Sequence, residues 1–189
     1  MSLSVIVLLV VLFVLYLMYA SLIAKKNKLK EAASGIEIQL KKRYDLIPNL
    51  LKMAAKFMAH EKDLMTEIVN LRNKALDNNF NQNPKEAMNL DTKISRKLKD
   101  FWVVCENYPD LKSNQTMVQA MQSFNEVEEH IAAARRFYNA ALTDLKNAVE
   151  TFPSSLIASL LGIKADMPFF KAEKEAFDKI NAEDFFKDK

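Results

Sequence analysis

The chain has 189 residues, half of them hydrophobic, which suits one membrane anchor and one domain of ordinary size. Two glycines are too few for a fold of many tightly turned strands, so the composition favours helices. The formal net charge is +3, but residues 1–30 hold four lysines and no acid, which leaves 3 − 4 = −1 for residues 31–189. The folded part is therefore nearly neutral, and the basic balance does not indicate a nucleic-acid partner.

The first predicted element is a transmembrane anchor over residues 1–24. Residues 3–24 carry no charge, and a helix of that length spans about 33 Å, enough to cross a hydrocarbon core of about 30 Å. Tyr16 and Tyr19 lie toward the end of the run, where aromatic rings favour the interface. A cleaved signal sequence fits less well, because no basic segment precedes the run and no small-x-small site ends it.

Four lysines follow the apolar run within six residues, namely Lys25, Lys26, Lys28 and Lys30. No basic residue precedes the run, so the positive-inside bias predicts an outside N-terminus and a cytoplasmic domain. The lipid bilayer is thus the first expected partner, with these lysines and the two tyrosines at its interface. The lysines could also attract anionic lipid head groups, with a binding free energy of about 1 kcal/mol for each lysine. Their effect on topology is nevertheless enough to explain their presence.

Two amphipathic segments come next. Apolar residues recur at three- and four-residue spacing over 29–44 and again over 50–75, the pattern of two helices with one buried face each. Asp45 could cap the second helix, with Pro48 in its first turn. Alternatively, both segments form one helix kinked at Pro48.

The third segment opens with a helix-start signature: Asn83 as N-cap, Pro84 at the first helical position and Glu86 at the third. In the fourth segment, apolar residues alternate three- and four-residue steps from Met117 to Phe152. This is the a/d seam of a coiled coil, sustained over five heptads in a helix from about residue 113 to 152.

Short connections favour antiparallel neighbours, so residues 25–163 are predicted to form an all-α, antiparallel up-down bundle with long coiled-coil-like helices. The four helices differ in predicted length, however, and the second and fourth overhang the first. Either the chain bends near Ser34 and Gly35, or it continues through Pro48, or the overhanging ends pack against neighbouring copies.

After Pro153 comes an apolar segment that is too short to span a bilayer. The fourth helix of an up-down bundle returns toward the membrane, so this segment is an expected interfacial or self-association patch, made of Leu156, Ile157, Leu160, Leu161 and Ile163. That it folds back to cover the bundle is equally open. Residues 164–189 form a charged tail, in which Phe177, Ile180, Phe185 and Phe186 could meet a protein partner.

The histidines do not complete a metal site. His60 and Glu61 begin like the zinc motif HExxH, but Leu64 stands where the second histidine belongs. We therefore expect His60 to be buried or to lie at the border of the apolar stripe. Glu126 and His130 lie one turn apart and are expected to be solvated charges beside the seam.

Other reactive residues have structural explanations. Cys105 lies on an apolar stripe, and a single cysteine excludes an internal disulfide and a structural zinc site. Arg135 and Arg136 are expected to pair with nearby acids such as Glu128. No glycine-rich loop could cradle phosphate. We expect no catalytic residue, no metal, no cofactor and no small-molecule substrate, and hence no enzyme.

Five segments carry a family resemblance: KKRYDLIPNLL (Lys41–Leu51), AAKFMAHEKDL (Ala54–Leu64), ENYPDLKSNQ (Glu106–Gln115), AARRFYNAAL (Ala133–Leu142) and FPSSLIASLLGI (Phe152–Ile163). With the anchor, their order and spacing resemble the LemA family over about residues 28–173. The resemblance implies a single-pass protein of the bacterial inner membrane with an all-helical cytoplasmic domain. It implies no activity, cofactor or catalytic residue, and the tail beyond Glu173 matches no family feature.

Two functions of different class follow. The first is a membrane-anchored scaffold that self-associates as a homo-oligomer, suggested by the long seam and the apolar patch. The alternative is an adaptor that recruits another envelope or cytoplasmic protein, suggested by the phenylalanines of the tail.

Overall fold

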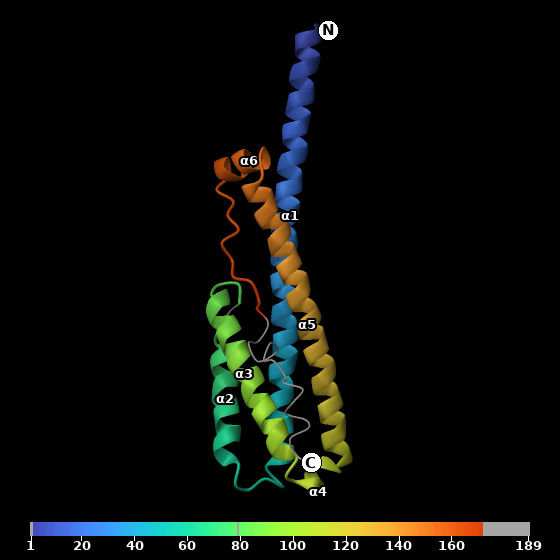
Figure 1. Ribbon diagram of the computed structural model, residues 1–189, viewed down its shortest axis with the longest axis vertical. Coiled ribbons are helices and arrows are strands. Elements are labelled where there is room, and N and C mark those ends of the chain that lie inside the picture. Colours follow the sequence, from blue (N-terminus) through green and yellow to red (C-terminus); the bar gives the residue numbers. More distant parts are fainter. Residues whose placement is uncertain (1, 79, 172–189) are drawn as a thin grey trace, which may run out of the picture.

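The longest element of the computed structural model, which describes residues 2–78 and 80–171, is one helix that runs through the whole molecule (Figure 1). This helix, α1 (Leu3–Ala54), has 52 residues and is about 78 Å long. Helix α5 (Gln115–Glu150) packs antiparallel along the C-terminal half of α1. The residues that the structure describes contain no strand, and the predicted all-α fold is confirmed.

A second pair of helices packs beside the first. Helices α2 (Lys62–Leu76) and α3 (Pro84–Cys105) form an antiparallel hairpin, and the short α4 (Pro109–Lys112) turns the chain into α5 at the end farthest from the N-terminus (Figure 1). Helix α6 (Ser154–Leu160) lies across the other end of the bundle, beside α1. The directions alternate along α1, α2, α3 and α5, which confirms the up-down arrangement.

The chain passes Pro48 without leaving the helix, so Asp45 does not cap a new helix, contrary to one of the two expectations. A proline inside a helix has no N–H to donate to the carbonyl four residues earlier, here that of Tyr44. In the structure the Nε of Arg72, on α2, donates to this carbonyl at 2.7 Å. A side chain from the neighbouring helix therefore satisfies the acceptor that Pro48 leaves open.

Helix α1 ends at Ala54, and the predicted second helix is consequently split. Its first residues, including Leu50, belong to α1, and its later ones to α2. The connection 55–61 turns the chain back and exposes His60, so the expectation that His60 is buried or borders the apolar stripe is wrong. Helical periodicity does not hold across a turn, and the histidine therefore falls on no helix face. The chain does not turn at Ser34 and Gly35, which lie within α1.

The two capping residues at loop ends explain where the later helices begin. The Oδ1 of Asn83 accepts a hydrogen bond from the backbone N–H of Glu86 at 3.4 Å, with Pro84 at the first helical position, as predicted. The Oδ1 of Asn114 accepts from the N–H groups of Thr116 and Met117 and starts α5 two residues later than expected.

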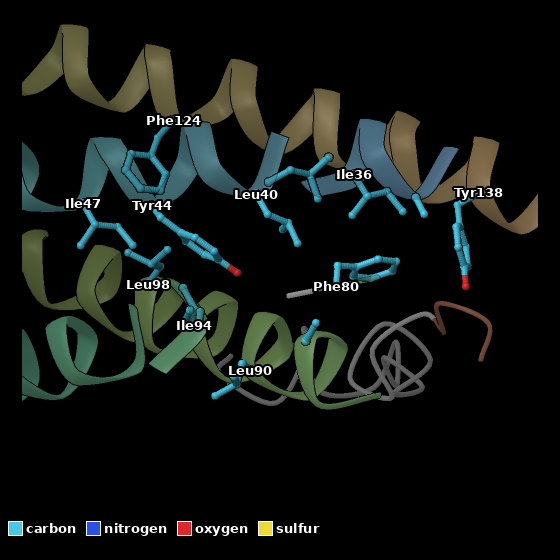
Figure 2. Packing of buried hydrophobic residues seen from close by; sticks show 14 of the residues in the cluster. Ile36, Leu40, Tyr44, Ile47, Phe80, Leu90, Ile94, Leu98, Phe124 and Tyr138 are labelled. Carbon is cyan, nitrogen blue, oxygen red and sulfur yellow. The ribbon is translucent and has the colours of Figure 1, made fainter. Parts of the chain in front are cut away.

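The seam of α5 is buried within this one chain. Its largest buried residues are Met117, Phe124, Ile131, Tyr138 and Leu145. They face α1 and the hairpin, whose buried residues include Ile36, Leu40, Tyr44, Ile47, Leu90, Ile94 and Leu98 (Figure 2). Phe152, by contrast, is 76 % exposed, because α5 ends at Glu150 and the chain turns away before the last predicted seam position.

A network of charges crosses the core and joins three helices. The guanidinium of Arg43 on α1 is fully buried and donates to Asp91 and Ser95 on α3 and, at 2.9 Å, to Glu128 on α5. Arg135 on α5 donates to the other oxygen of Asp91. Burial alone lowers the pKa of Arg43, but the carboxylates of Asp91 and Glu128 outweigh it and raise that pKa.

This network corrects one expectation. Arg135 pairs with Asp91, 44 residues away in sequence, and not with Glu128, which pairs with Arg43 instead. Glu126 and His130 are exposed side chains 3.7 Å apart, which confirms them as solvated charges beside the seam.

The first residues of the predicted tail lie against the bundle. The side-chain amide of Asn139 donates to the carbonyl of Phe170 at 2.9 Å, and its Oδ1 accepts from the N–H of Phe170 at 3.0 Å. The ring of Phe170 stacks on that of Phe80, with centroids 5.8 Å apart. Residues 164–171 are thereby held to α5, whereas the phenylalanines and isoleucine proposed as partner contacts (Phe177, Ile180, Phe185 and Phe186) lie outside the described residues.

Candidate membrane interface

The N-terminal part of α1 projects from the bundle as a bare apolar rod (Figure 1). Every residue from Leu3 to Leu17 is exposed, and the exposed fraction of the large side chains runs from 43 % at Val5 to 78 % at Leu3. So large an apolar surface is unfavourable in water and is typical of a segment that meets lipid. This helix is long and apolar enough to cross a bilayer.

The bundle begins before the apolar run ends. Leu22 is only 1 % exposed, and Ile23 packs against the core. The free rod therefore extends from Leu3 to Ser21, about 28 Å of helix, which is still close to the thickness of a hydrocarbon core. Tyr16 and Tyr19 lie at its bundle end with exposed rings, at the level expected for an interface.

One of the four lysines takes part in the bundle. The Nζ of Lys28 lies 3.0 Å from the Oδ2 of Asp144 on α5 and 5.8 Å from the ring centroid of Phe137. The hydrogen bond and the charge of Lys28 lower the pKa of Asp144. No local pattern indicated Asp144 as a functional residue, because its partner lies 116 residues earlier in the sequence.

The other lysines have different surroundings. Lys25 and Lys26 are half-buried, with Lys25 facing the end of α5, while Lys30 is exposed. The four basic residues thus lie at the base of the rod but do not form one uniform surface.

Helix α6 lies at the same end of the bundle and exposes an apolar stripe. Leu156 and Leu160 lie one helical turn apart and are 64 % and 87 % exposed. A short helix with such a stripe, lying across the bundle beside the apolar rod, is suited to the surface of a bilayer (Figure 1). Phe152, which the sequence assigned to the seam, is 76 % exposed in the turn between α5 and α6.

The predicted patch therefore has two sides. Leu156, Leu160 and Leu161 are exposed, whereas Ile157 packs against the core and Ile163 is only 7 % exposed. One face of the segment covers the bundle, and the other is exposed. The segment therefore combines the two alternatives, an exposed apolar patch and a cover for the bundle.

Comparison with known proteins places this architecture in a family. The model of the LemA family matches residues 32–183, most of the chain. The chain belongs to the LemA family. A LemA protein from Metamycoplasma hominis is 23 % identical over 157 residues, which cover 83 % of this chain and 71 % of that protein. The LemA match also extends ten residues beyond Glu173, so the expectation that the tail lacks any family counterpart is wrong.

Two further relatives carry a different name. The magnetosome proteins MamQ 1 and MamQ 2 of Paramagnetospirillum magneticum are each 22 % identical over 173 residues, which cover 79 % of this chain. The LemA-family chain spans only 64 % of the length of these two proteins. Neither name states a reaction or a ligand.

Proposed function

We propose that this LemA-family protein is a non-enzymatic, single-pass scaffold of the bacterial inner membrane. In this proposal the rod of α1 crosses the bilayer with its N-terminus outside, and the bundle stands in the cytoplasm with α6 on the membrane surface. The observation that carries the proposal is the continuity of α1, because one unbroken helix is bare and apolar at one end and forms the bundle core at the other.

Such a helix acts as a rigid support. Of its buried residues, Leu22 is the first and Ala54 the last, so packing holds more than half of the helix against α5 and the hairpin. The bundle is therefore held at one distance and angle relative to the apolar rod. A rigid mount of this kind suits a protein whose task is to hold others, or copies of itself, at a membrane.

Self-association remains part of the proposal, but it would use other surfaces than the seam. The seam residues of α5 already pack against this chain's own helices. The rod of α1 and the stripe of α6 are exposed apolar surfaces suited to contact between copies, and both lie at the proposed membrane end. An adaptor is the second candidate, favoured by the family match that continues through residue 183 into the tail.

Accessible cysteines would test anchoring and orientation. In a Cys105→Ala background, Ser2→Cys and Ser113→Cys place one thiol at each end of the molecule, both at exposed positions. We expect the protein to resist alkaline extraction from membranes. A membrane-impermeant maleimide should label position 2 in intact spheroplasts and position 113 only after lysis. Equal labelling of both positions, or release into the soluble fraction, would refute the proposal.

Cross-linking in native membranes would separate scaffold from adaptor. A photoreactive residue at position 160 on α6 should link two copies if the protein self-associates at the membrane end. The same group at position 77, at the end of α2, is the control and should give no such link. Links from position 160 to one other protein, with none between copies, would instead support the adaptor.

A further inference from the structure

An open pocket of about 510 Å³ lies where the rod of α1 enters the bundle. One wall is a face of α1, and the other is formed by the end of α5 and the start of α6. The α1 wall runs from Leu17 to Lys25, about 12 Å along the helix. The pocket therefore spans the level at which an apolar anchor gives way to a charged domain.

The chemistry of the walls changes along that length. Leu17 and Met18 line the pocket on the side of the rod, whereas Lys25, Asn147 and Thr151 contribute an ammonium, an amide and a hydroxyl. An apolar part and a polar part in this order match the junction between the acyl chains and the head group of a lipid. A small hydrophilic anion would leave the apolar part without a partner.

The charges in the pocket do not balance. Asp144 also lines it, but this carboxylate is already paired with Lys28 at 3.0 Å. Among the described residues, Lys25 forms no ion pair, although its charge also lowers the pKa of Asp144. Two lysines therefore share this one carboxylate. The ammonium of Lys25 is thus an excess positive charge in a half-buried position, where attraction to an anion is screened less than at the open surface.

We propose that this pocket binds the phosphodiester group of an anionic glycerophospholipid with an uncharged head group, and this proposal rests on the proposed membrane anchoring. Lys25 donates hydrogen bonds to the phosphate, and the head-group hydroxyls bond to Asn147 and Thr151. The acyl chains lie along Leu17 and Met18 toward the bilayer core. Such a lipid touches both walls and so ties α5 and α6 to α1 at the membrane surface.

The test uses the full chain in nanodiscs made of equal parts phosphatidylglycerol and phosphatidylcholine. Native mass spectrometry of the released protein counts the lipids that each copy retains. We expect the wild type to retain one phosphatidylglycerol in preference to phosphatidylcholine, and Lys25→Gln to lower that preference about fivefold. Thr151→Val, which keeps the net charge, should also lower it.

Lys30→Gln is the matched control, since it removes the same charge from an exposed position about 140° round the helix from Lys25. Equal losses in Lys25→Gln and Lys30→Gln would show only general attraction to anionic lipid and would overturn the site. Unchanged retention in both Lys25→Gln and Thr151→Val would overturn it as well.

Three further outcomes identify the source of the phosphate and show which of the two proposals fails. Displacement of the lipid by millimolar glycerol phosphate would mean that the pocket binds a soluble phosphoester, against the proposal. A wild type that stays in the discs but shows no preference for phosphatidylglycerol would refute the lipid site alone. A wild type that does not insert into the discs would refute the membrane anchoring and the lipid site together.

Discussion

Asp91 is the residue on which the buried charges of the core depend. Its two carboxylate oxygens accept from two different arginines, Arg43 on α1 and Arg135 on α5. Arg43 has no contact with solvent, and its charge would be unfavourable in the core without such partners. Buried pairs of this kind add little net stability, but loss of one partner leaves a charge uncompensated.

Asp91→Ala should therefore lower the free energy of unfolding by about 3–5 kcal/mol, measured by urea denaturation in detergent micelles. Asp100→Ala, on the same helix, removes an exposed carboxylate 4.0 Å from Lys97 and should change stability by less than about 1 kcal/mol. Similar small losses in both variants would contradict the role assigned to Asp91.

The thiol of Cys105 is a second residue whose chemistry follows from burial. Its side chain lies in the core beside Met58, with the two sulfur atoms 3.9 Å apart, and burial raises the pKa of the thiol to about 11. The thiolate is the reactive form, so a raised pKa makes this cysteine inert at neutral pH.

We expect a thiol reagent at pH 8 to modify Cys105 only as the protein unfolds, at a rate that follows urea concentration. Because the folded pKa lies above the unfolded value of about 8.5, the stability associated with this group is fully present below pH 8.5. It is lost as the pH rises toward 11. Fast labelling of the native protein at pH 8 would show that the thiol is accessible.

At the scale of elements, the passage of α1 through Pro48 is decided by a contact from another helix. The proline removes one hydrogen bond from the helix, and the Nε of Arg72 replaces it by donating to the carbonyl of Tyr44. This contact also fastens α2 to α1 near the turn at residues 55–61. Helix continuity and hairpin packing are consequently coupled.

A double-mutant cycle on Pro48→Ala and Arg72→Met would measure this coupling. With Pro48 in place, Arg72→Met leaves the Tyr44 carbonyl without a donor and should lower the free energy of unfolding by about 1–3 kcal/mol. After Pro48→Ala, the new backbone N–H can bond to that carbonyl, and Arg72→Met should then have a smaller effect. Strictly additive effects in urea denaturation would contradict the explanation.

At the scale of the whole molecule, the overhang of α1 and α5 beyond the hairpin forms the end from which the apolar rod projects. The hairpin of α2 and α3 is shorter, so the upper parts of α1 and α5 extend past it and are closed by α6 (Figure 1). The overhanging ends pack against each other within this chain, where Leu22 is buried. Closure by a neighbouring copy is thus unnecessary for the bundle itself.

The exposed stripe of α6 should give the bundle its own affinity for membranes. A fragment that lacks residues 1–21 should still float weakly with phosphatidylglycerol vesicles, and Leu156→Asp with Leu160→Asp should lower its partition coefficient more than about tenfold. Val103→Asp is the control, since Val103 is 61 % exposed but lies on α3, away from α6. Equal effects of both changes would show that α6 is not the contact.

The long apolar helix and the starts of α3 and α5 could be predicted from local sequence, because they depend on residues close together in the chain. A charge-free run predicts a span by its length alone, and Asn83 with Pro84 starts α3 through contacts within one turn. The apolar periodicity likewise identified most of the core of α5. It failed at Phe152 and His60, where the chain turns and a helical spacing no longer describes which residues share a face.

Which distant residues meet depends on how the helices pack against one another. Arg72 reaches the carbonyl freed by Pro48, Arg135 takes Asp91 in preference to a nearby acid, and Asp144 pairs with Lys28. Each contact joins different helices, and its partners are set by how the helices pack in register, which no single segment encodes. The pocket at Lys25 exists for the same reason: it is the space between the base of the rod and the returning end of α5.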